Sequence, residues 1–219
     1  MNGLVKSIDA EIERRSLLKH PFYKMWSEGK LNLEHLAGYS KEYFQLVKAV
    51  PEMVKNIEAF VTDSSNRAVV SEILMEETQH VDLWAKFAGA LGVSREILTS
   101  YPGTPKTNRS LSGLISLTKA SFGEAVAAAY ALESEQPTIS RSKLDGLRRF
   151  YGMDSDDGTV YFRVHEEADV RHAAVWRDTL QDMNGGDEEK MLNAATTSLN
   201  TQNVMLDSVM ENCEDLLHS

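Results

Sequence analysis

Three short motifs carry side chains whose types and spacing could bind transition-metal ions. The first is HEEADVRH, residues 165–172, which places His165, Asp169 and His172 at intervals of four and then three residues. On an α-helix, at about 100° per residue, these side chains fall within about 40° of one another and form a single stripe. Imidazole and carboxylate groups are ligands that suit iron, manganese and zinc. The sequence therefore predicts a metal-binding stripe on one helix.

A second motif pairs a glutamate with a histidine at helical spacing. Glu77 and His80 stand three residues apart within LMEETQHVDLW, residues 74–84. This Glu-x-x-His spacing puts a carboxylate and an imidazole on one helix face, as in di-iron carboxylate bundles. Glu76 also lies one helical turn before His80 and is the alternative ligand. Ferritin-type sites carry two such motifs, whereas this sequence has one, which indicates a different arrangement of ligands.

The third motif is an isolated glutamate in an apolar, alanine-rich segment. Glu133 lies one helical turn before Pro137, among residues that favour burial. A buried, unpaired carboxylate is costly, so Glu133 needs a partner or a metal ion. Any one of the three motifs could be structural, but together they predict a site for two transition-metal ions. Its expected ligands are Glu77, His80, Glu133, His165, Asp169 and His172.

The length, charge and cysteine content of the chain limit the classes of protein to which it can belong. The chain has 219 residues, of which 42% are hydrophobic, and this is enough for one sizeable core in a single domain, 1–219. A net charge of -10 argues against nucleic-acid or anionic-lipid partners, which need clustered Lys and Arg. The lone Cys213 cannot form an internal disulfide. Neither a secretory signal nor a membrane-length apolar run is apparent, so we expect a cytoplasmic protein, with a homodimer as the expected assembly.

Helix-breaking residues such as proline, together with turn-forming segments, show where the helices that position these ligands begin and end. Long proline-free intervals rich in Ala, Leu, Glu and Lys predict an all-α fold without strands. Loops are expected at 101–110 and 181–190, and they separate a main bundle, 1–182, from an amphipathic helix that docks on it. The predicted helices are 2–17, 32–60 with a kink at Pro51, 65–91, 94–100, 110–135, 138–151, 156–182 and 187–217.

Over nearly its whole length, the sequence resembles a known family. The matching stretches are HPFYKMWSEGKL (20–31), LMEETQHVDLWAKFAGALGV (74–93), KLDGL (143–147) and YFRVHEEADVRH (161–172). They are similar to the heme-oxygenase-like di-metal oxidases of the PqqC/TenA-like superfamily, in the group typified by the chlamydial protein associating with death domains. The resemblance implies a heme-oxygenase-like seven-helix bundle. It also implies a dinuclear Fe/Fe or Fe/Mn site, dioxygen as co-substrate and an external reductant.

The resemblance further implies a reaction in which the enzyme consumes itself. The implied activity is a para-aminobenzoate synthase of folate biosynthesis, in which Tyr23 provides the aromatic ring and Lys143 the amino group. A phenol ring is electron-rich enough to be oxidised, and a buried lysine of lowered pKa can present a neutral amine. Taken without the resemblance, Tyr23 would be a core aromatic residue and Lys143 a surface lysine.

The sequence departs from this family in two places. The relatives separate the first glutamate and its histidine by a longer insert, so the plain Glu77-x-x-His80 here predicts an unbroken helix. Leu132 stands where the relatives carry a tyrosine, and leucine cannot carry a radical. The sequence leaves the shared ligand open between Glu133 and Asp169. Candidate relay residues are Tyr39, Tyr43, Tyr130 and Tyr161.

Two other functions remain open at this point. The same di-metal site could oxidise an external small molecule such as an amino acid or a fatty acid. Alternatively, the chain could be an interaction protein without catalysis. Replacing Tyr23 separates the first alternative from self-sacrifice, and stoichiometric metal with oxygen uptake argues against the second.

Overall fold

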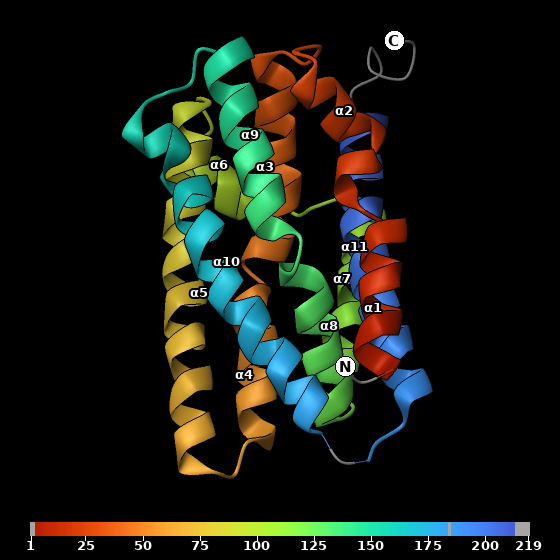
Figure 1. Cartoon of the computed structure of the whole chain (residues 1–219). Helices are drawn as coiled ribbons and strands as arrows, with labels where there is room; N and C mark the ends of the chain where they lie inside the picture. Colours follow the sequence, from red (N-terminus) through yellow and green to blue (C-terminus); the bar gives the residue numbers. More distant parts are fainter. Residues whose placement is uncertain (1–2, 184, 213–219) are drawn as a thin grey trace.

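The computed structural model describes residues 3–183 and 185–212. These residues form eleven α-helices and one short 3-10 turn, Leu17–Lys19, and they contain no strand, which confirms the predicted all-α class. The helices are α1 (Gly3–Arg14), α2 (Pro21–Ser27), α3 (Leu33–Val47), α4 (Val50–Phe60), α5 (Ser64–Ala90), α6 (Arg95–Ser100), α7 (Pro105–Thr118), α8 (Phe122–Glu133), α9 (Gln136–Phe150), α10 (Asp156–Asp182) and α11 (Glu188–Glu211) (Figure 1).

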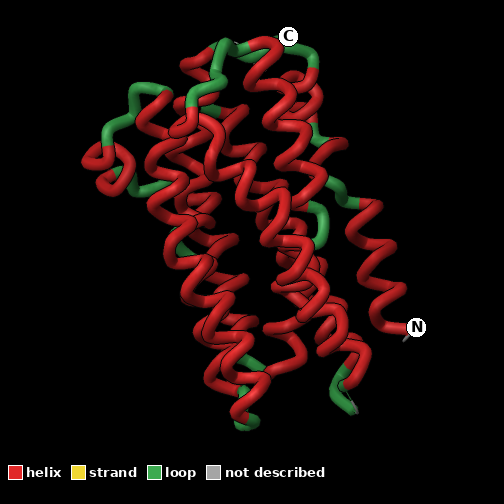
Figure 2. The backbone as a smooth tube through the Cα atoms, turned by 60° about the vertical axis from the view of Figure 1, so that its left-hand side comes forward, coloured by secondary structure: helices red, strands yellow, loops and turns green. Residues whose placement is uncertain are grey.

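Most of the helices run lengthwise along the bundle, with most loops towards its two ends (Figure 2). In Figure 1, α10 crosses the bundle diagonally between α5 and α8, and it packs against both of them and against α9. These three helices, α5, α8 and α10, carry all the predicted metal ligands. No helix in the described part of the chain has both the length and the apolar character needed to cross a bilayer.

Two predicted helices are divided in the structure. The predicted helix 32–60 is α3 followed by α4, because Pro51 stands in the first turn of α4, where its missing N–H is tolerated. The predicted helix 110–135 is α7 followed by α8, and α7 begins five residues early, inside the predicted loop 101–110. Thr104 and Ser121 start these helices by accepting hydrogen bonds from backbone N–H groups in their first turns.

Helix α2 lies in a stretch for which the sequence predicts no helix. His20 caps it by accepting a hydrogen bond from the N–H of Phe22, and Pro21 occupies its first position. Its buried face consists of Phe22, Tyr23 and Trp26. The His-Pro pair therefore fixes the helix that carries Tyr23.

Helix α11 is the amphipathic helix predicted over 187–217. It packs against α8 and α7, and its buried face includes Leu199, Met205 and Leu206. Cys213 and the predicted helical residues after 212 lie outside the described residues. The other boundaries agree with the predicted ones to within a few residues, and α10 coincides with the predicted 156–182.

Candidate metal centre

The six predicted ligands meet in the interior of the bundle. Each of these side chains is 6% exposed or less. Helix α5 is unbroken from Ser64 to Ala90, as the plain Glu-x-x-His spacing predicts, so it holds its two ligands at fixed pitch. The ligands come from α5 (Glu77, His80), α8 (Glu133) and α10 (His165, Asp169, His172).

The ligand atoms form two groups that share one carboxylate. In each group, the atoms lie within 4.8 Å of one another: one group is Glu77, His80 and His165, and the other is Glu77, Glu133 and His172. Oε1 of Glu77 lies 3.3 Å from Nδ1 of His80 and 3.2 Å from Nδ1 of His172. Glu77 is therefore the residue common to both groups, whereas the sequence suggested Glu133 or Asp169 as a bridging carboxylate, and the identity of the bridge stays a prediction.

Asp169 lies at the edge of the second group. Its Oδ1 is 3.8 Å from Nδ1 of His172, but Asp169 belongs to neither of the two groups. Nδ1 of His172 is also 3.6 Å from Oε2 of Glu133. The three carboxylates of the cluster therefore converge on one imidazole nitrogen.

The described residues leave few buried side-chain atoms without a hydrogen-bond partner, and nearly all of them belong to this cluster. An unsatisfied buried polar group costs about 1–3 kcal/mol, so such a concentration requires a compensating ligand. Two cations among these lone pairs would satisfy them, and the residues present therefore fit a dinuclear metal site. The atoms are Oε1 of Glu77, Nδ1 of His80, Oε1 of Glu133, both carboxylate oxygens of Asp169 and Nδ1 of His172, with Oγ of Ser198 the exception elsewhere.

The electrostatics of the cluster also favour bound metal ions. Burial raises the pKa of Glu133 to about 8, with a further contribution from Glu77. Burial and the carboxylates of Glu77 and Glu133 raise the pKa of Asp169 well above its usual range. Burial and the neighbouring His80 lower the pKa of His165 to about 3, so its imidazole is neutral and free to coordinate. A closely packed set of carboxylates needs protons or cations to balance its charge.

Groups around the cluster fix the orientation of its imidazoles. Nδ1 of His165 lies 2.8 Å from the carbonyl oxygen of Tyr161, which can only accept, so Nε2 of His165 is left for a metal ion. Nε2 of His172 lies 2.6 Å from Oε2 of Glu76, which leaves Nδ1 of His172 facing the cluster. Nη2 of Arg171 also donates a hydrogen bond to Oε1 of Glu76 at 3.1 Å. The structure therefore places Glu76, the alternative ligand, behind His172 and outside both groups.

Removal of the Glu76 carboxylate is expected to loosen the site. Because partners behind a metal-bound histidine typically contribute 10–100-fold to affinity, Glu76→Ala is expected to weaken metal binding by about that factor. Glu76→Gln is expected to recover part of it, since its amide oxygen can accept from His172. Competition with a chelator measures both effects, with the exposed Glu72→Ala as the control on the same helix. Unchanged affinity in Glu76→Ala would contradict the assigned role.

A small cavity adjoins the cluster. Its volume is about 30 Å³, room for about one water-sized molecule. Pockets that bind organic ligands usually measure about 300–1,000 Å³. The cavity is therefore far smaller than the pockets that usually hold an amino acid or a fatty acid. It is lined by Glu77, Glu133, His165 and Asp169 together with Tyr43, Leu46, Val47, Val50, Leu132, Gln136 and Tyr161.

Tyr23 and Lys143 are both buried and lie close together. Each is 1% exposed, so Lys143 is not a surface residue. Nζ of Lys143 donates to Oη of Tyr39 at 2.7 Å, and Oη of Tyr39 is 3.4 Å from Oη of Tyr23. Nζ also lies 5.2 Å from the centre of the Tyr23 ring. The structure thus brings the predicted ring and amine together through one intervening phenol.

The surroundings of Lys143 favour its neutral form. Burial lowers the pKa of Lys143 to about 7, although the charge of Asp169 opposes part of this shift. The rings of Tyr39, Tyr43 and Phe162 lie 5.1–5.2 Å from Nζ. Near neutral pH, a large share of this amine therefore carries a free lone pair.

Aromatic side chains connect Tyr23 with the cluster. Tyr23 does not line the cavity in the described structure, whereas Tyr43 and Tyr161 do. The ring of Tyr161 stacks on His165 with centres 3.9 Å apart, and the Tyr43 ring lies 5.2 Å from the Tyr39 ring. Leu132, which cannot carry a radical, also lines the cavity. Tyr43 and Tyr161 are therefore the candidate relay residues that lie beside the cluster.

Tyr130 does not line the inner cavity, and Trp176 contacts the cluster although the sequence did not single it out. The hydroxyl of Tyr130 donates to Asp9 at 2.6 Å, and the residue does not line the inner cavity. Trp176, which the sequence analysis missed, donates from Nε1 to Oε2 of Glu133 at 2.8 Å. Trp176 follows His172 by four residues, so it continues the stripe that starts at His165. That spacing was the signal that could have found it.

An all-helical bundle with a buried imidazole and carboxylate cluster defines a class of metal-dependent redox proteins. A family model described as "Iron-containing redox enzyme" matches residues 37–203, and the chain belongs to this family. It is an oxidoreductase that uses metal. The family places iron among its metals, in agreement with the donor set.

Two curated relatives are similar over most of their length. A protein of Chlamydia muridarum named 4-aminobenzoate synthase is 34% identical over 214 residues, which cover 95% of this chain and 91% of the relative. A protein of Nitrosomonas europaea with the same name is 35% identical over 190 residues, 80% of this chain and 77% of the relative. These similarities support the family that the sequence motifs indicated.

The fold has counterparts among solved structures. A domain of unknown function with a heme oxygenase-like fold, from Shewanella denitrificans, superposes with a TM-score of 0.78 at 17% identity. The superposition covers 96% of this chain and 90% of the other. At this identity the likeness speaks for the fold alone, and it confirms the predicted heme-oxygenase-like bundle.

Proposed function

We propose that this protein is a 4-aminobenzoate synthase that builds its product from its own Tyr23 side chain and the amino group of Lys143. The observation that carries the proposal is the burial of these two side chains together, with Nζ of Lys143 5.2 Å from the Tyr23 ring. A solvent-shielded lysine beside a phenol is unusual, because burial of an amine is costly unless it serves a purpose. The two curated relatives bear the name of this activity.

The atoms of the two side chains match those of the product. In 4-aminobenzoate, a carboxyl carbon stands opposite an amino group on the ring. In tyrosine, Cβ stands opposite the hydroxyl group. The Tyr23 ring with Cβ therefore supplies the whole carbon skeleton once the Cα–Cβ bond breaks, Cβ is oxidised to a carboxylate and nitrogen replaces the phenol oxygen. Lys143 supplies this nitrogen from Nζ, so its Cε–Nζ bond breaks as the new carbon–nitrogen bond forms on the ring, and the phenol oxygen leaves as water.

The size of the cavity supports an internal substrate. A volume of about 30 Å³ has no room for an external aromatic molecule, whereas it suits dioxygen as co-substrate. An oxidase of an external amino acid or fatty acid would need a pocket about ten times larger beside the cluster. The geometry thus favours self-sacrifice over the external-substrate alternative.

The proposed centre contains two ions, Fe/Fe or Fe/Mn, and draws electrons from an external reductant. Glu77, His80 and His165 would hold one ion, and Glu77, Glu133 and His172 the other, with Asp169 beside the second group. When bound, these ions would activate dioxygen, which is the oxidant of the reaction. The chain's own residues exclude bulk water, align His165 against Tyr161 and hold the Lys143 amine near Tyr23.

Intact-mass spectrometry tests the proposal. The purified protein is incubated with iron, manganese, dioxygen and a reductant, and its mass and 4-aminobenzoate yield are followed together. A loss of mass that maps to Tyr23 and to Lys143, with no more than one product molecule per chain, is expected. Product formation from a chain of unchanged mass would overturn self-sacrifice.

The pH dependence of product formation is expected to follow Lys143. Its pKa of about 7 means that the amine is protonated below this pH and neutral above it. Since nitrogen must attack through its lone pair, single-turnover rates are expected to rise about tenfold per pH unit below 7 and to level off above it. Rates measured in quenched samples between pH 5.5 and 8.5 check this. A rate that falls as the pH rises through 7 would contradict the role of Lys143.

A further inference from the structure

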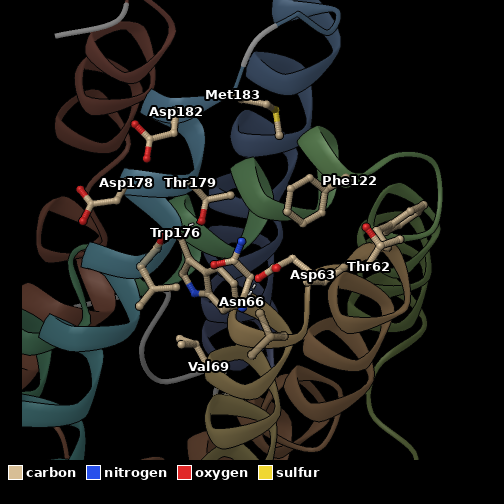
Figure 3. Close-up of a pocket in the computed structure, with 14 residues that line it drawn as sticks. Thr62, Asp63, Asn66, Val69, Phe122, Trp176, Asp178, Thr179, Asp182 and Met183 are labelled. Atoms are coloured by element: carbon tan, nitrogen blue, oxygen red, sulfur yellow. Dashed lines mark hydrogen bonds between the residues drawn. The ribbon is translucent and has the colours of Figure 1, made fainter.

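Trp176 connects the metal cluster with a second, larger pocket. Nε1 of Trp176 donates to Oε2 of Glu133, and the same side chain lines a pocket of about 530 Å³ between α5, α8 and α10 (Figure 3). This volume lies within the range of about 300–1,000 Å³ that is typical of ligand sites. The small cavity at the cluster lacks the room for an organic ligand, but this outer pocket has it.

The outer pocket has aromatic and aliphatic side chains on its walls, and its only charged groups among the described residues are carboxylates. Figure 3 shows Trp176 on α10 at one side and the Phe122 ring of α8 at the other, while Asp178 and Asp182 project from α10. Phe60 and Phe122 lie with ring centres 6.4 Å apart. Among the described residues that line it, none is Lys, Arg or His. Aromatic faces and carboxylates together favour a planar aromatic molecule with positive charge.

Other routes from the surface to the cluster lack these features. A groove of about 680 Å³ reaches Asp169, but it contains Arg177, and its aromatic residue, Tyr130, donates to Asp9 rather than to the cluster. Trp84 has no exposed surface and donates from Nε1 to the Ser40 carbonyl oxygen. Within the described structure, Trp176 alone both lines a ligand-sized pocket and donates a hydrogen bond to a candidate metal ligand.

We propose that the outer pocket binds an aromatic, positively charged one-electron donor and that Trp176 relays the electron from it to the cluster. The inference rests on the external reductant of the proposed function. In each transfer, the donor loses one electron and a ferric ion held by the cluster becomes ferrous. No bond forms or breaks, so only the donor is consumed.

Binding is tested with methyl viologen, an aromatic dication that quenches tryptophan fluorescence. Titration of the oxidised dye is expected to quench the Trp176 emission saturably, and Trp176→Phe should abolish this saturable component. Because exposed ion pairs contribute only modestly to binding, the double variant Asp178→Asn, Asp182→Asn is expected to weaken binding about fivefold. Asp157→Asn, at the opposite end of α10, is the matched control and should bind as the wild type does.

Electron transfer is tested without dioxygen on protein loaded with ferric iron. Bleaching of the blue methyl viologen radical cation reports each electron that leaves the dye. A fast phase is expected in the wild type, slowed about fivefold at low dye concentration in the double Asp variant, in proportion to its weaker binding. Trp176→Phe, compared with the wild type at equal iron content after reconstitution, is expected to lose the fast phase.

Either of two results would overturn the proposal. One is wild-type dye binding and bleaching in the double Asp variant, whose substitutions do not contact the cluster and leave iron loading intact. The other is an unchanged fast phase in Trp176→Phe at equal iron content. Because neither assay measures 4-aminobenzoate, a failure here leaves the proposed function standing. Conversely, a chain that makes no product can still show the fast phase.

Discussion

Replacement of Tyr23 by phenylalanine is expected to abolish 4-aminobenzoate formation completely. Phenylalanine keeps the ring but lacks the oxygen-bearing carbon at which the amino group must enter. The fold should persist, because the ring still packs on Phe22 and Trp26. Only the contact between the hydroxyls of Tyr23 and Tyr39 is lost, and this costs about 1 kcal/mol or less. Product is measured by liquid chromatography after incubation with metal, dioxygen and reductant.

The matched control for this prediction is Tyr130→Phe. Tyr130 is also largely buried and loses its hydroxyl hydrogen bonds, one donated to Asp9 and one accepted from Arg177, but it lies outside the inner cavity. Its product yield is expected to equal that of the wild type. If Tyr23→Phe still forms product while it binds metal normally, the ring must come from elsewhere, and an external substrate or another tyrosine becomes the explanation.

Replacement of Glu77 by glutamine is expected to produce the largest loss of metal. Glu77 is the residue common to both groups of ligand atoms, and its Oε1 faces both His80 and His172. A glutamine keeps the size of the side chain but removes the negative charge that a bridging position needs. The variant is therefore expected to retain at most one ion per chain where the wild type retains two. Elemental analysis after reconstitution and desalting gives both values.

Glu72→Gln is the control, since it removes an exposed carboxylate from the same helix. It should bind the full complement of metal. A Glu77→Gln variant that also keeps two ions would show that the bridge lies on another carboxylate, and Glu133 and Asp169 would then be the residues to replace.

The convergence of the six side chains could be predicted from the sequence because helical spacing sets their relative placement. His165, Asp169 and His172 lie on one unbroken helix, α10, which Ser155 caps, so their relative placement follows from residue number alone. Glu77 and His80 follow the same rule on α5. The choice between Glu76 and Glu77 could not be made in this way. Both lie within a turn of His80, and only the packing of α5 against α10 decides which one faces the cluster.

Features that depend on tertiary packing were harder to predict. Lys143 lies on a helix that also carries the exposed Arg148 and Arg149, and nothing in the local sequence shows that its amine is enclosed by aromatic rings from α2, α3 and α10. The break between α7 and α8 was missed because no proline or strongly turn-forming pair interrupts the sequence there. The shared role of Glu77 likewise depends on where three helices converge.

The most direct test of self-sacrifice uses isotope-labelled protein together with unlabelled reagents. Protein is produced with tyrosine whose ring carries carbon-13, purified, and supplied with unlabelled metal, dioxygen and reductant. The account predicts that all 4-aminobenzoate formed has the mass of the fully ring-labelled molecule, and that the label disappears from position Tyr23 of the chain. Unlabelled 4-aminobenzoate from a fully labelled protein would contradict it.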